Sequence, residues 1–178
     1  MKKTLSAVML FVLGAVAMVV SQQVGQTPPA LTALDYAEIQ QLYTRYNFAT
    51  DSKADDGEMW VRTFTEDGVF DGTNPVSAYP YPVEGHEELK AYTTRNLAPG
   101  DTSPRFPAHF TTNILIEPRT EGAMGAAHIV WMGEDGVLGR GSYHDELVKT
   151  LEGWRFKQRL NTIGAFTDEL IQALEQTQ

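Results

Sequence analysis

The chain has 178 residues, of which 42% are hydrophobic, and this length and composition suit a folded domain with one core. It carries 23 acidic against 14 basic side chains, a formal net charge of −9, which argues against a nucleic acid as partner. It has no cysteine, so disulfides, a thiolate nucleophile and a zinc–thiolate site are excluded.

The N-terminus predicts export. Lys2 and Lys3 precede an uncharged apolar run that ends at Val20, and Ser21 offers a cleavage site, which is the pattern of a secretory signal peptide. The run is close to the ~20 residues that a membrane-spanning helix needs, so an uncleaved anchor is the alternative. We expect a signal peptide over residues 1–21 and a mature protein that is secreted or periplasmic.

The mature chain predicts a flexible lead over residues 22–31 and one domain over residues 32–178. Thr32 or Asp35 can cap a first helix, and Asp35 stands at capping-box spacing from Glu38. The helix should end near residues 50–53. Apolar residues at helical spacing predict its buried stripe: Ile39, Leu42, Tyr43 and Tyr46.

A second helix is predicted over residues 58–64, and Val69 begins a short strand. Residues 72–84 form a loop by their proline, glycine, asparagine and serine content. A third helix is expected over residues 86–96.

The second half of the domain predicts an antiparallel run of strands. Helices followed by such a run indicate an α+β fold rather than a parallel sheet. A final amphipathic helix is expected over residues 168–175. The four predicted strands cover residues 106–117, 123–132, 139–150 and 154–162.

Asp51 and His109 are the candidate acid/base residues. An anion is unfavourable at the end of a helix, so Asp51 has either a functional role or a merely solvated one. Alternation puts His109 with Thr111 on the more polar face of its strand, and Ile114 and Ile116 on the other face. A histidine there is either simply hydrogen-bonded or a base that a carboxylate orients. The spacing does not show that the two residues meet.

Arg159 is the candidate for electrostatic stabilisation. Alternation places it on one strand face with Arg155 and Lys157, which is typical of a solvated surface. A guanidinium at the inner end of that strand could instead stabilise developing negative charge.

No cofactor motif is present in the sequence. The remaining histidines, His86, His128 and His144, occur singly and lack metal-site spacing, and no Gly-rich phosphate loop or G-x-S-x-G motif occurs. We therefore predict that the protein uses neither a metal nor an organic cofactor.

Several aromatic residues are core residues by default, and in a half-open cavity they would contact an apolar ligand. Trp131, with Trp154 and Phe156, could instead form an oligomer interface. The residues predicted to bind substrate are Tyr46, Trp60, Phe64, Phe70, Trp131 and Tyr143.

A series of motifs occurs in a specific order: residues 39–43 before Asp51, then 60–70, Gly85, 109–113, 141–148, and 153–156 before Arg159. In order and spacing they resemble the SnoaL-like group of the nuclear transport factor 2-like superfamily. The resemblance implies a cone, in which a curved antiparallel sheet wraps around a long N-terminal helix and a pocket opens at the wide end.

Within this superfamily the chain is most similar to hexachlorocyclohexane dehydrochlorinase and scytalone dehydratase. The resemblance assigns Asp51 to the helix aspartate that supports a proton-removing histidine, His109 to that histidine, and Arg159 to a pocket arginine. Tyr46 and Tyr143 are candidates for the two active-site tyrosines of the dehydratase. The loop over residues 72–84 is longer than in the dehydrochlorinase.

These observations favour a cofactor-independent lyase or isomerase that acts on a largely apolar small molecule. His109 would remove a proton, Asp51 would orient it, and Arg159 or a tyrosine would stabilise the departing or enolic oxygen. Two alternatives stay open: a non-catalytic periplasmic module that binds a hydrophobic ligand, and an oligomeric interaction domain with a vestigial pocket. A homo-oligomer, dimer or trimer, is compatible with all three.

Overall fold

The computed structural model describes the chain from Ala30 to Phe166, except residues 53, 74–80 and 97–107. The predicted signal peptide and the predicted C-terminal helix lie outside these described residues. Within the described part, no helix is long and apolar enough to span a membrane.

The long first helix, α1 (Ala33–Ser52), is capped by a different pair than the spacing predicted. The Thr32 hydroxyl accepts a hydrogen bond from the Asp35 backbone N–H at 3.2 Å, and Asp35 Oδ2 accepts one from the Thr32 N–H at 2.9 Å. The capping box is therefore Thr32–Asp35, which confirms Thr32 among the two candidate caps, whereas the Asp35–Glu38 spacing does not form the cap. The buried stripe follows helical spacing and includes Ile39, Leu42, Tyr43, Tyr46 and Ala49.

A left-handed turn leads from α1 into the next helix. Asp55, Asp56 and Gly57 have φ angles of 58°, 54° and 84°. A Cβ atom at Gly57 would lie 2.5 Å from Thr93 Oγ1, so only glycine fits there. Because Gly57 has no side chain, the later helix that carries Thr93 can lie close against this turn.

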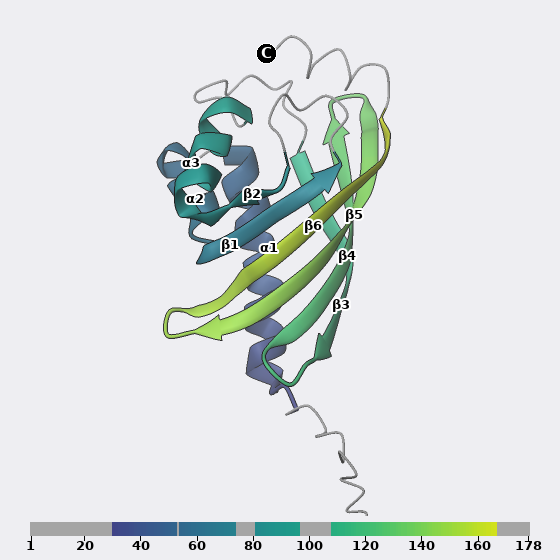
Figure 1. Ribbon diagram of the computed structural model, residues 1–178. Coiled ribbons are helices and arrows are strands. Elements are labelled where there is room, and N and C mark those ends of the chain that lie inside the picture. Colours follow the sequence, from purple (N-terminus) through teal and green to yellow (C-terminus); the bar gives the residue numbers. More distant parts are fainter. Residues whose placement is uncertain (1–29, 53, 74–80, 97–107, 167–178) are drawn as a thin grey trace, which may run out of the picture.

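The second predicted helix is shorter than expected, because α2 (Glu58–Val61) ends before the chain becomes a strand. Strand β1 (Phe64–Thr73) is correspondingly longer than the short strand predicted from Val69. The two-residue strand β2 (Val83–Glu84) lies at the end of the predicted loop and pairs with β1, and α3 (Gly85–Asn96) follows it. The helices α2 and α3 both lie beside β1 (Figure 1).

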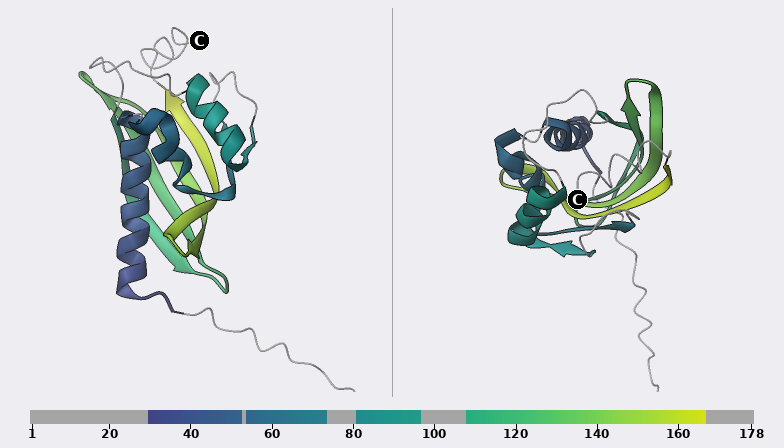
Figure 2. Two further views of the ribbon diagram at one scale, coloured as in Figure 1. Left: turned by 90° about the vertical axis from the view of Figure 1, so that its left-hand side faces the viewer. Right: turned by 90° about the horizontal axis from the view of Figure 1, so that it is seen from above.

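The four predicted strands of the second half are confirmed as β3 (Ala108–Pro118), β4 (Ala123–Gly133), β5 (Gly136–Thr150) and β6 (Gly153–Phe166). The six-stranded sheet has the order β2-β1-β6-β5-β4-β3. It is mixed rather than purely antiparallel, since β1 pairs with β6 in parallel. The sheet curves around α1, which lies on its concave side (Figure 2).

A β-bulge in β3 overturns the predicted alternation of its side chains. The register with β4 shifts between Thr112 and Leu115, and Asn113 inside the bulge has a φ of 53°. One extra residue reverses the faces beyond that point. Ile116 is consequently buried on the same inner face as His109, whereas Leu115 is 58% exposed on the outer face.

A second bulge has the same effect in β6, where Lys157 has no partner in β5 between the pairs Leu147–Phe156 and Glu146–Gln158. Arg159 therefore lies on the inner face with Phe156. The prediction that Arg159 shares a face with Lys157 was wrong. The three aromatic residues suggested for an oligomer interface are buried, so they do not supply an exposed face: Trp131, Trp154 and Phe156.

The core contains a buried ion pair between Arg159 and Asp145, which are directly paired residues of β6 and β5. Arg159 Nε and Nη2 each donate to one carboxylate oxygen at 2.8 Å, and neither side chain is exposed. The Tyr43 hydroxyl of α1 donates to Asp145 as well. Burial by itself would lower the pKa of Arg159. The Asp145 carboxylate has the larger combined effect, so the pKa of Arg159 lies above its ordinary value.

Four aromatic rings enclose the guanidinium of Arg159. Its Cζ lies 3.8 Å from the ring centroid of Phe156 and 3.9 Å from that of Tyr143. The corresponding distances to Tyr46 and Tyr43 are 4.1 and 4.9 Å. These cation–π contacts compensate part of the cost of removing the charge from water.

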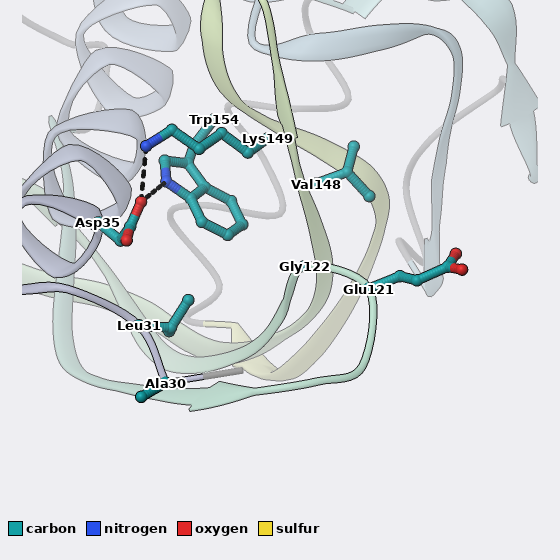
Figure 3. A pocket seen from close by; sticks show the side chains of 8 residues that line it. All are labelled: Ala30, Leu31, Asp35, Glu121, Gly122, Val148, Lys149 and Trp154. Carbon is teal, nitrogen blue, oxygen red and sulfur yellow. Dashed lines mark hydrogen bonds and ion pairs between the residues drawn. The ribbon is translucent and has the colours of Figure 1, made fainter. Parts of the chain in front are cut away.

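The start of α1 is attached to the hairpin between β5 and β6 by one carboxylate. Asp35 Oδ1 accepts hydrogen bonds from Lys149 Nζ at 2.7 Å and from Trp154 Nε1 at 3.1 Å (Figure 3). These residues line a shallow groove of about 350 Å³ together with Leu31 and Gly122. The hydrogen bonds from Lys149 and then from Thr32 lower the pKa of Asp35.

The first testable prediction concerns acid stability. Because folding lowers the pKa of Asp35, its contacts stabilise the fold above the ordinary carboxyl pKa of about 3.9, and this stabilisation is lost as the pH falls from about 5. Asp35→Asn should therefore flatten the acid loss of unfolding free energy, measured by urea unfolding at successive pH values. The exposed turn residue Glu134 gives the control Glu134→Gln, which should keep the wild-type slope. An unchanged slope in Asp35→Asn would contradict this role.

The second prediction concerns the buried ion pair. Asp145→Ala leaves the Arg159 charge buried without its partner, so the free energy of unfolding should fall by about 3–5 kcal/mol. Urea unfolding at neutral pH measures it. The control is Asp55→Asn, which alters the ion pair between Asp55 and Arg62. These side chains are 62% and 68% exposed, so the free energy of unfolding should change little. A loss in Asp145→Ala no larger than in the control would show that the pair is dispensable.

Candidate functional site

The last turn of α1 and the start of β3 bring Asp51 and His109 together. Asp51 Oδ1 lies 2.5 Å from His109 Nδ1, and Asp51 Oδ2 accepts a hydrogen bond from the His109 backbone N–H at 3.0 Å. The side chains of Asp51 and His109 are 30% and 19% exposed. The carboxylate is thus held against both the ring and the backbone of His109, and both side chains remain partly exposed to solvent.

This contact determines what the imidazole can do. A carboxylate at Nδ1 favours the tautomer that carries its proton there, which leaves the Nε2 lone pair of His109 to accept another. When Nε2 takes a proton, the same carboxylate stabilises the imidazolium. Asp51 and His109 therefore have the geometry of a supported general base.

A second pair, which sequence reasoning missed, fastens the same two elements. Asn47 Nδ2 donates to Thr111 Oγ1 at 2.9 Å, and Thr111 Oγ1 donates to Asn47 Oδ1 at 3.2 Å. Asn47 lies one helical turn before Asp51, and Thr111 lies two residues after His109, so each shares a face with its neighbour. Those two spacings are the sequence signal that could have revealed the pair.

Trp131 is the aromatic neighbour of His109. The two residues are directly paired across β4 and β3, and their rings meet edge-on, with centroids 5.8 Å apart and planes at 81°. Trp131 is 6% exposed, so it forms a mostly covered apolar wall beside the imidazole. It is the member of the predicted substrate-binding set that contacts the Asp51–His109 pair.

The other five predicted substrate-binding residues pack into one another. Tyr46 has ring-centroid distances of 5.6 Å to Trp60, 6.1 Å to Phe64 and 5.8 Å to Tyr143, and Trp60 lies 5.4 Å from Phe70. Each is at most 4% exposed. Burial raises the pKa of Tyr46 and of Tyr143, so both hydroxyls stay protonated. This cluster is core, in agreement with the default interpretation of these residues.

Arg159 is not part of the contact between Asp51 and His109. Its hydrogen bonds go to Asp145, and no hydrogen bond or ion pair joins it to either member of the pair. Its third nitrogen, Nη1, is buried and has no hydrogen-bond partner among the described residues. Arg159 therefore supplies a fixed positive charge inside the fold, at a place distinct from the imidazole.

The comparisons with known proteins agree with this architecture. The family model of the SnoaL-like domain matches residues 31–160, and no curated protein sequence matches the chain. A protein of unknown function with a cystatin-like fold from Nostoc punctiforme has a TM-score of 0.62 at 25% identity, over 75% of this chain and 94% of that one.

Two further solved structures share the fold. LinA has a TM-score of 0.60 at 18% identity, over 75% of this chain and 88% of LinA. A Novosphingobium aromaticivorans protein proposed to be a scytalone dehydratase has a TM-score of 0.58 at 20% identity, over 76% of this chain and 87% of that one. The chain belongs to the SnoaL-like domain family and has the nuclear transport factor 2-like fold.

Proposed function

We propose that the protein is an exported, cofactor-independent lyase or isomerase in which His109 removes a proton from a carbon atom of a largely apolar small molecule. The observation that carries this proposal is the two-point contact of the Asp51 carboxylate with the ring and the backbone of His109. Such a contact serves a base that must keep one tautomer and one orientation.

In an elimination, His109 Nε2 takes the proton, and the electron pair of the broken C–H bond forms a C=C bond. The leaving group takes the electron pair of its own bond: a halide departs as the anion, and a hydroxyl departs as water with a proton that the imidazolium or solvent supplies. In an isomerisation the proton returns from the imidazolium to a different carbon, and nothing leaves. Both reactions are balanced without a metal, an oxidant or a second substrate, and Asp51 stabilises the imidazolium in each.

Two features of the fold support an apolar substrate with a polar reacting end. Trp131 offers an apolar edge beside the imidazole, which suits a hydrophobic substrate. Arg159 keeps a positive charge inside the fold, and because it is fully buried and lies apart from the imidazole, we assign it an electrostatic effect on developing negative charge rather than a hydrogen bond to the substrate. The dehydratase named among the similar structures leads us to propose elimination before isomerisation.

The third prediction tests the base. Asp51→Asn and His109→Gln should each reduce turnover by about 10²- to 10⁴-fold, because the base loses its support or is removed. Since the substrate is unidentified, the assay is NMR detection of deuterium uptake from D₂O into a panel of apolar ketones, together with product analysis of apolar β-hydroxy and β-halo compounds. Asp55→Asn, a change at an exposed residue three positions after the end of α1, is the control and should retain full activity.

Thermal unfolding should show that the two active-pair variants remain folded. An Asp51→Asn protein with undiminished turnover would overturn the mechanism. Tight binding of an apolar compound by the wild type, with no deuterium uptake or product from any of the panel, would favour the non-catalytic binding module instead.

A further inference from the structure

Asn47 is a polar side chain in the buried stripe of α1. It is 9% exposed and lies one helical turn after Tyr43, which is buried as well. An apolar side chain would serve the packing of the helix on the sheet about as well, because replacing both partners of a buried hydrogen bond with apolar groups is nearly neutral for stability. The amide of Asn47 therefore calls for a reason other than packing.

Both ends of this amide contact one hydroxyl group. Asn47 Nδ2 donates to Thr111 Oγ1 at 2.9 Å, and the same Oγ1 donates to Asn47 Oδ1 at 3.2 Å. Thr111 lies in β3 and is partly buried. Hydrogen bonds are directional, whereas apolar contacts are not, so this two-bond contact selects one position of the helix along the strand.

Two parallel contacts cross from α1 to β3. Within the described part of the chain, the side-chain hydrogen bonds between these elements join Asn47 to Thr111 and Asp51 to His109. The two contacts are about 6 Å apart along the helix and about 7 Å apart along the strand. One contact alone would let the end of the helix pivot about it, whereas two contacts fix both its distance and its angle.

The start of β3 depends on this support from α1. In the described sheet β3 is an edge strand, so only β4 pairs with it. The bulge that follows Thr112 separates the segment with His109 and Thr111 from the rest of the strand. Since β4 holds these two residues from one side, α1 must hold them from the other.

We propose that Asn47 and Thr111 are positioning residues, whose two hydrogen bonds hold the last turn of α1 where Asp51 meets His109. Their effect on turnover rests on the proposed function, because a base needs one tautomer and one orientation of its ring. Their effect on the contact between Asp51 and His109 does not rest on it, and it can be measured without a substrate.

The fourth prediction compares two changes of Thr111. Thr111→Val removes the hydroxyl and keeps the shape of the side chain, whereas Thr111→Ser keeps the hydroxyl. The His109 backbone N–H donates to Asp51 Oδ2, so its hydrogen exchange, measured by NMR, should accelerate at least about 10-fold in Thr111→Val. Thr111→Ser should keep the wild-type rate, and the amides of β5 should keep theirs in both variants.

A second measurement follows the ring of His109. At alkaline pH the neutral ring of the wild type should carry its proton on Nδ1, which faces Asp51 Oδ1, and ¹⁵N chemical shifts report the fraction that does. Thr111→Val should lower this fraction, and Thr111→Ser should not. With a substrate found by the deuterium assay, Thr111→Val should lower kcat about 10- to 100-fold with little change in KM, because a misplacement of ~1 Å can cost 100-fold.

A double variant separates positioning from stability. Asn47→Leu together with Thr111→Val replaces both polar partners with apolar groups, so its thermal unfolding midpoint should stay within about 3 °C of the wild type. The fast exchange of the His109 amide and the loss of the Nδ1 tautomer should nevertheless persist. A double variant that recovers both signals along with its stability would show that the pair only stabilises the fold, and would overturn the proposal.

Two further outcomes would overturn it as well: a Thr111→Val protein with the wild-type exchange rate at His109, or a Thr111→Ser protein that exchanges as fast as Thr111→Val. If the wild type shows no turnover while the NMR signals change as expected, the proposed function fails and the positioning role stands.

Discussion

The packing of one face of α1 against the concave side of the sheet is the contact on which the rest of this structure depends. It is driven by burial of the apolar stripe that runs from Ile39 to Ala49. Because the helix is held along its length, its two ends are held as well. Asp35 at the start bonds the β5–β6 hairpin, and Asp51 at the end meets His109 in β3.

At the centre of that packing lies a charge rather than a purely apolar core. Arg159 is bonded to Asp145 through two nitrogens and enclosed by four aromatic rings, and Tyr43 of α1 joins the same carboxylate. Such a group costs free energy to bury and tolerates few alternative arrangements. It therefore links the helix to β5 and β6 by geometry that a slipped register would break.

The inner face of the sheet carries the site that we propose. The inner face carries the imidazole, its apolar neighbour Trp131 and the buried charge, which together suit proton transfer on a small molecule. Bulges decide which residue belongs to which face, so they contribute as much to function as the residue types do.

Periodicity, turn residues and motif order are local properties, and they suffice to predict the helical stripe of α1, the four long strands and the candidacy of Asp51 and His109. Only the tertiary structure decided that these two residues, 58 positions apart, are in contact. It also decided that Arg159 faces inward and Leu115 outward, against simple alternation. A bulge depends on how a strand pairs with its neighbour, and no local pattern contains that pairing.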